Sequence, residues 1–182
     1  QQWVLFLMEN SNSPRSISRK ISTLKSFWRF LLVRRLTDEN PTLKLVLPKT
    51  KKPLPTFYRE QEMDNALSEN SRTGGFEAVR NRMIVELFYQ TGLRVSELVS
   101  LRDSSIDFAS GQLRVIGKRN KERIIPLGES VCAELKSYQE VRNKETELPS
   151  DALFVRKNGM PMYSKAIYNI VHQKMSEVST LH

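Results

Sequence analysis

The sequence predicts a mainly α-helical protein with a small antiparallel β-sheet, an α+β fold. Several segments carry apolar residues at spacings of three and four, which is the period of a helix. Between residues 105 and 126, three short segments rich in β-branched residues are separated by turn sequences, as in a small antiparallel sheet. A proline cluster between residues 40 and 55 separates two halves, so we expect two domains.

The composition excludes several classes of protein. The 182 residues are 39% hydrophobic, enough to bury a core. One cysteine, Cys132, excludes an internal disulfide, and two histidines form no cluster at metal-ligand spacing, so we expect no metal. No stretch is long and apolar enough to span a membrane, and the first ten residues do not resemble a signal peptide. We therefore expect a soluble, cytoplasmic protein that does not act at a membrane.

Positive charge is concentrated in the first third of the chain. Lysine and arginine number 29 against 20 acidic residues, and residues 1–60 hold 12 of the basic and 4 of the acidic ones. No acidic residue occurs between Glu9 and Asp38. Such a block is typical of a polyanion-binding surface, although a merely solvated basic face is the alternative.

The first two predicted helices cover residues 1–9 and 16–36. The second has an apolar stripe, which we expect to be core: Ile17, Ile21, Leu24, Trp28 and Leu31. Arginines and small hydroxyl residues fall on the opposite face: Arg15, Arg19, Ser22, Ser26 and Arg29. A face of this kind suits close approach to a phosphate backbone, so we predict that its three arginines contact DNA.

Prolines bracket a basic run that we interpret as an extended linker over residues 48–57. Its lysines, Lys49, Lys51 and Lys52, are candidates for contacts along a DNA backbone, and a plain solvated linker is the alternative for each.

The remaining elements follow in order. Helices are expected over residues 58–69, 76–90 and 95–101, with Gly92 as a helix stop. Strands are expected over residues 105–108, 112–117 and 123–126. A helix over residues 130–144, a short hairpin turning at Asn158-Gly159, and a last helix capped by Ser164 complete the chain.

Two motifs give the chain a specific resemblance. TGLRVSEL at residues 91–98, then Asp107-Phe108, then VIGKRNKERIIPL at residues 115–127, resemble the first catalytic box and β-hairpin of Xer-type tyrosine recombinases of the phage integrase family. SPRSISRKIS at residues 13–22, Asn40-Pro41 and Leu47-Pro48-Lys49 resemble the same family's core-binding domain and linker.

The resemblance implies a helical core-binding domain at residues 1–47, incomplete at its N-terminus, and a catalytic domain at 58–182, truncated at its C-terminus. Together they would form a C-shaped clamp around double-stranded DNA, and the parent protein would assemble as a homo-oligomer, a tetramer on DNA. A tyrosine hydroxyl would attack the scissile phosphodiester to give a 3′-phosphotyrosyl enzyme. No cofactor and no small-molecule substrate are implied, because the covalent link stores the bond energy.

Carried over by position, Arg94 matches the first catalytic arginine, which stabilises charge on the phosphate, and Lys118 matches the lysine that protonates the leaving 5′ oxygen. Glu97 matches a position with a supporting role. Residues Arg119, Asn120 and Lys121 match the hairpin tip that approaches DNA, with Arg119 in place of a glycine often found there. The resemblance also supports Arg15 and Arg19, whereas Arg29 depends on the helical wheel alone.

The family's His-x-x-Arg box, its later His or Trp and its nucleophilic tyrosine have no match in residues 1–182, and both ends of the chain look cut. The chain's own tyrosines occur too early for that role: Tyr58, Tyr89, Tyr138, Tyr163 and Tyr168. We therefore expect residues 1–182 to bind DNA weakly and to cleave nothing. The alternatives are a non-catalytic DNA-binding module or accessory protein of the same fold, and a basic helical interaction protein with no nucleic-acid role.

Overall fold

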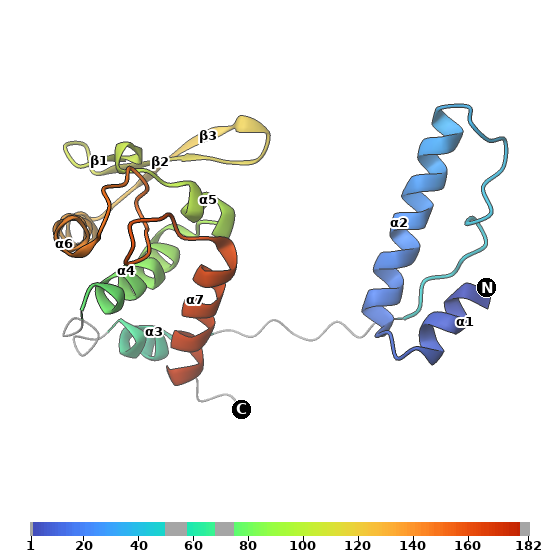
Figure 1. The fold of residues 1–182 in the computed structure, drawn as a ribbon, viewed down its shortest axis with the longest axis horizontal. Coiled ribbons are helices and arrows are strands. Elements are labelled where there is room, and N and C mark those ends of the chain that lie inside the picture. The colour runs from blue at the N-terminus through green and yellow to red at the C-terminus, as the bar shows by residue number, and fades with distance from the viewer. Residues whose placement is uncertain (1, 50–57, 68–74, 179–182) are drawn as a thin grey trace. The chain divides into compact units, whose positions relative to one another are not determined.

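The structure, a computed structural model, describes residues 2–49, 58–67 and 75–178 and divides into two compact units, Gln1–Thr56 and Phe57–His182 (Figure 1). The described residues are mostly helical and include one three-stranded antiparallel sheet, which confirms the predicted fold class. No described helix is both long and apolar enough to cross a membrane.

The first unit consists of α1 (Gln2–Glu9), α2 (Pro14–Val33) and an irregular segment after them. Helix α2 begins two residues earlier than predicted, because the Ser13 hydroxyl accepts a hydrogen bond from the Ser16 amide at 3.2 Å and caps it. It ends three residues earlier, where Arg35 takes a φ of 55°.

The predicted apolar stripe of α2 is buried only at its N-terminal end. Ile17 and Ile21 form a small core with Leu7 of α1. Leu24, Trp28 and Leu31 are half-buried, so the expectation that the whole stripe is core was wrong within this unit. The reason is that α1 spans only eight residues and covers one end of the 20-residue α2.

The second unit is built around α4 (Phe76–Thr91), which packs against α6 (Glu129–Glu145) and α7 (Ser164–Val178). Helix α3 (Glu60–Ala66) and helix α5 (Val95–Ser100) both pack against α7. Ser164 is the first residue of α7 rather than its cap, since the helix's first backbone bonds go to the Tyr163 carbonyl. In the core, the ring of Tyr138 packs against Phe76 and Phe154.

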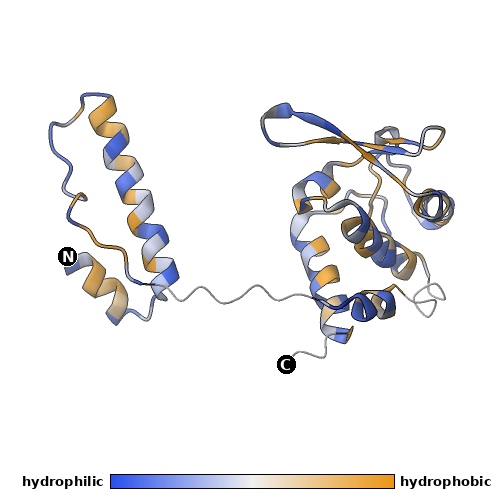
Figure 2. Ribbon diagram, turned by 180° about the vertical axis from the view of Figure 1, so that it is seen from behind, coloured by the Kyte–Doolittle hydropathy of each residue, from blue (hydrophilic) through white to orange (hydrophobic). Residues whose placement is uncertain are grey.

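The sheet has the order β1 (Ile106–Asp107), β2 (Gln112–Ile116), β3 (Glu122–Pro126). Alternate residues of β2, Leu113 and Val115, are buried, and they lie opposite Ile125 and Arg123 of β3. A 3₁₀ turn, η3 (Lys118–Asn120), connects the two strands where the sequence predicted a hairpin turn. The β2–β3 hairpin projects from the helices, and its outer end is hydrophilic (Figures 1 and 2).

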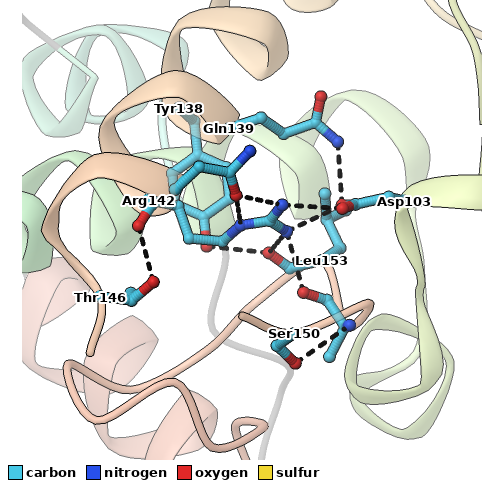
Figure 3. A network of polar contacts seen from close by, with 9 residues as sticks. Asp103, Tyr138, Gln139, Arg142, Thr146, Ser150 and Leu153 are labelled. Carbon is cyan, nitrogen blue, oxygen red and sulfur yellow. Dashed lines mark hydrogen bonds and ion pairs between the residues drawn. The ribbon is translucent and has the colours of Figure 1, made fainter. Parts of the chain in front are cut away.

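A buried arginine fastens the base of this sheet to α6 (Figure 3). Arg142 donates two hydrogen bonds of 2.7 Å to the two carboxylate oxygens of Asp103, which lies in η2 (Asp103–Ser105) just before β1. The same guanidinium donates to the carbonyl of Ala152 at 2.9 Å, and the Tyr138 hydroxyl donates to that of Leu153 at 2.9 Å. The network thus ties α6, the start of the sheet and residues 152–153 together.

Candidate functional site

The corner between α4 and α5 presents Arg94. Gly92, at a φ of 60°, ends α4 in the left-handed conformation that suits glycine, and α5 begins three residues later. Glu97, in the first turn of α5, reaches back and accepts a hydrogen bond of 2.7 Å from the Arg94 amide. Its other oxygen accepts one of 2.9 Å from Nη1 of the Arg94 guanidinium.

A second arginine binds the same carboxylate. Arg123 of β3 donates from Nη1 to Oε1 of Glu97 at 2.8 Å and from Nη2 to Oε2 at 3.0 Å. The Glu97 side chain is only 4% exposed. The hydrogen bonds from Arg123, followed by those from the Arg94 amide and guanidinium, outweigh burial and lower the pKa of Glu97 from 4.5 to about 2. Glu97 is therefore an anion at every physiological pH.

Arg94 and Lys118 border one open hollow of about 680 Å³, which is also lined by Ser96, Glu97, Ile116 and Gly117. Although Arg94 bonds to Glu97, its side chain is 70% exposed. Lys118, the first residue of η3, is exposed as well. Two cations of different geometry, one a planar fork and one a proton-bearing ammonium, thus face the same space, an arrangement suited to holding a phosphate group.

Gly117 permits the close approach of hairpin and helix. A side chain at this position would begin 3.3 Å from Oε1 of Glu97 and 3.7 Å from Nη1 of Arg123. The Gly117 amide donates to the Lys121 carbonyl at 2.8 Å, which closes the hairpin around η3. Lys118 is therefore placed by a turn that lies directly against the Glu97 carboxylate.

The other predicted hairpin residues lie at its outer end. Arg119 and Asn120 belong to η3, with Asn120 at a φ of 57°, and Lys121 follows it. The side chains of Asn120 and Lys121 are exposed. The backbone of these residues follows Lys118 directly, and the side chains of Asn120 and Lys121 do not line the hollow.

In the first unit, Arg15, Arg19 and Arg29 are all exposed on α2, as the helical wheel predicted. Lys49 is exposed at the end of the described segment. Lys51 and Lys52, and the predicted linker from residue 50 onward, lie outside the described residues. The contacts of these side chains with DNA stay predictions.

Arg123 is a site residue that the sequence motifs did not point to. Residues 122, 124 and 126 of β3 are exposed, whereas Arg123 and Ile125 face inward. A signal was available, since the alternation of Arg123 with Ile125 in a predicted strand places the arginine on the inward face, where a charged group needs a hydrogen-bonding partner. The identity of that partner depends on the fold, because Glu97 lies 26 positions earlier in the chain.

In a comparison with known protein families, the model of the phage integrase family matches residues 57–180. The chain is 36% identical to tyrosine recombinase XerC of Staphylococcus carnosus, with 100% of this chain and 62% of the relative covered. It is 38% identical to XerC of Oceanobacillus iheyensis, with 97% of this chain and 59% of the relative covered. The chain thus spans about three fifths of the length of these curated relatives.

Solved structures show the same fold at lower identity. A λ integrase tetramer bound to a Holliday junction is similar with a TM-score of 0.72 and 16% identity, over 98% of this chain and 50% of that one. The XerH recombinase bound to its difH substrate is similar with a TM-score of 0.69 and 18% identity, over 94% of this chain and 51% of that one. XerA recombinase is similar with a TM-score of 0.60 and 22% identity, over 97% of this chain and 59% of that one.

Proposed function

Because the chain belongs to the phage integrase family, we propose that it is part of a tyrosine recombinase, which breaks and rejoins DNA strands, and that Arg94 and Lys118 act in its active site. In this proposal residues 1–47 form a core-binding domain, residues 48–57 a linker and residues 58–182 a large part of the catalytic domain. The parent protein acts in the cytoplasm, as a tetramer on double-stranded DNA.

The observation that supports the proposal best is the orientation of Arg94 by a buried carboxylate beside an exposed lysine. Within the described part of the chain, Arg94 uses only its Nη1 group to bind Glu97, which leaves Nη2 and Nε available to a ligand. Negative charge grows on the non-bridging phosphate oxygens as a phosphodiester is attacked. A guanidinium already held in position stabilises that charge without a cost of reorganisation.

The proposed reaction needs no cofactor. A tyrosine from outside residues 1–182 forms a bond from its phenolic oxygen to phosphorus and loses its proton, while the bond from phosphorus to the 5′ oxygen breaks. The Lys118 ammonium supplies the proton that the leaving 5′ oxygen takes up. Tyr138 is unsuited to the attack, because it is fully buried and burial raises the pKa of its phenol above the usual range.

DNA contacts outside the hollow come, in this proposal, from Arg15, Arg19 and Arg29 on α2, the linker lysines, and the hairpin tip at residues 119–121. All of these act on the phosphate backbone, which carries no sequence information directly.

Salt-dependent binding of a mixed-sequence DNA duplex to the 182-residue chain tests the proposal. We expect log K to fall with log salt at a slope of about −4 to −5, for roughly five neutralised phosphates. Arg94→Ala should weaken binding about tenfold, the value of one charge-assisted hydrogen-bond pair.

Arg102→Ala is the matched control, because Arg102 is also exposed and paired with a carboxylate, that of Asp151, away from the hollow. It should change the affinity less than twofold. Absence of salt-dependent binding by the wild-type chain, or equal losses in the two variants, would contradict the proposal.

A second candidate function is DNA binding without catalysis. In this case Arg94 and Lys118 hold a phosphate of the DNA backbone without acting on it. Salt dependence does not separate the two functions, whereas a covalent protein–DNA adduct formed by the longer parent protein does.

A further inference from the structure

We propose that Arg123 is a positioning residue: it fixes the β2–β3 hairpin, and with it Lys118, relative to Arg94 through the carboxylate that both arginines share. The inference rests on the proposed function, which makes Lys118 and Arg94 partners in one reaction. It adds a residue to which neither the sequence motifs nor the resemblance assigned a role.

The geometry of the Glu97 carboxylate carries the proposal. Arg123 binds it with two parallel hydrogen bonds of 2.8 and 3.0 Å, the fork-to-fork arrangement that fixes orientation as well as distance. Arg94 binds the same carboxylate through its amide and its guanidinium. One buried anion therefore joins the residue that begins α5 to the strand that leads out of η3.

The outer part of the hairpin has little apolar packing to hold it. Leu113 and Val115 are the buried, inward-facing residues of β2, and Val115 is the last of them before the turn. The next position on the same face is Gly117, which has no side chain to pack against the core. Arg123 stands opposite Val115, at the boundary between the packed and the projecting part. A directional polar contact at this boundary restrains the projecting turn where apolar burial no longer does.

Gly117 gives an independent indication that the contact is close. It directly precedes Lys118, and its Cα lies so near to Oε1 of Glu97 and to Nη1 of Arg123 that a β-carbon would be in tight contact with the former. The turn that carries Lys118 thus lies against the Arg123–Glu97 pair itself. Loss of the pair should therefore increase the mobility of Gly117 and Lys118 first.

Amide hydrogen exchange on the 182-residue chain tests the structural part. The reporter is the Gly117 amide, which donates to the Lys121 carbonyl, and the reference is the amide of Leu135 in the core helix α6. Arg123→Gln should speed exchange at Gly117 about tenfold and leave Leu135 unchanged. Arg114→Gln is the control, since Arg114 lies on the same hairpin and pairs with Glu122 at 3.0 Å but does not touch Glu97; it should leave Gly117 within about twofold of wild type.

Affinity for a mixed-sequence duplex tests whether Arg123 acts through Lys118. Arg123→Gln and Lys118→Ala should each weaken binding several-fold, and the double variant should bind as weakly as Lys118→Ala alone. If Arg123 contacted DNA itself or served only general stability, the two losses would multiply.

If the losses of DNA affinity in Arg123→Gln and Lys118→Ala multiply in the double variant, the proposal is overturned. It is also overturned if Arg123→Gln leaves the exchange rate of Gly117 unchanged, or if Arg114→Gln raises that rate equally. If the wild-type chain bound no DNA, the proposed function would fail. The exchange rate at Gly117 would then still decide by itself whether Arg123 holds the hairpin.

Discussion

Replacing Glu97 by glutamine should remove a pH-dependent part of the second unit's stability. The pKa of Glu97 is lowered from 4.5 to about 2 in the folded chain, which corresponds to roughly 3.4 kcal/mol if fully realised. Its partners Arg94 and Arg123 are 70% and 38% exposed, so solvent screening reduces the contribution to about 1–2 kcal/mol.

The direction of the pH dependence follows from the lowered pKa of Glu97. A carboxylate that is more acidic in the folded state stabilises the fold above its unfolded pKa, and this stability is lost as the pH falls through the folded value. With pKa values of 4.5 and about 2, about three fifths of the contribution is lost by pH 3, and screening that brings the folded pKa closer to 4.5 makes the lost share larger. The wild-type chain should therefore lose about 1 kcal/mol more than Glu97→Gln between pH 6 and pH 3.

Urea unfolding of the two proteins at a series of pH values measures this difference. All five tyrosines lie after residue 57 and both tryptophans before it, so near-ultraviolet tyrosine dichroism reports the second unit and tryptophan fluorescence the first. The difference should appear in the tyrosine signal and not in the tryptophan signal. Identical pH dependence of wild type and Glu97→Gln in the tyrosine signal would show that the Glu97 carboxylate does not stabilise the second unit.

Three further predictions concern neighbouring parts of the second unit. Arg142→Ala should lower the free energy of unfolding by about 2–3 kcal/mol, because it removes a buried donor to the carbonyls of Ala152 and Leu153 and the partner of Asp103, whose side chain is 38% exposed. A loss below about 1 kcal/mol in urea unfolding would contradict this. Gly92→Ala should lower the free energy of unfolding by about 1 kcal/mol, since Gly92 has a φ of 60°. Gly128→Ala should lower it by no more than a few tenths of a kcal/mol, since Gly128 has a φ of −67° and open space around it. Equal melting temperatures of the two variants would contradict this prediction. Lys118→Ala should reduce the salt slope of DNA binding by about one, and an unchanged slope would exclude a phosphate contact.

The periodicity of the sequence predicted the elements of the fold because their apolar faces are local patterns. Helix α4 and strand β2 differ from their predicted bounds by one residue each. The burial of α2 was predicted less well, since the helical wheel identifies an apolar stripe but not what covers it. Leu24, Trp28 and Leu31 remain half-buried for that reason.

The site was predictable where a motif carried it and not where the fold assembled it. The motifs pointed to Arg94 and Lys118, which the structure places on one hollow. Arg123 escaped notice because its pairing with Glu97 spans α5, β1, β2 and η3, and no local spacing records such a contact. The pairing of Arg142 with Asp103, 39 positions apart, was hidden for the same reason.

Covalent capture of DNA by the longer parent protein tests whether it is a tyrosine recombinase that uses Arg94 in its active site. The full-length gene product is incubated with sheared genomic DNA of its source organism, denatured with detergent and precipitated, so that only covalently attached DNA is recovered. We expect recovery of DNA by the wild-type protein and a loss of about 100-fold or more in Arg94→Ala, the usual effect of removing a charge-stabilising donor. Arg102→Ala should recover nearly as much DNA as wild type. Failure of the full-length protein to capture DNA, or undiminished capture by Arg94→Ala, would contradict it.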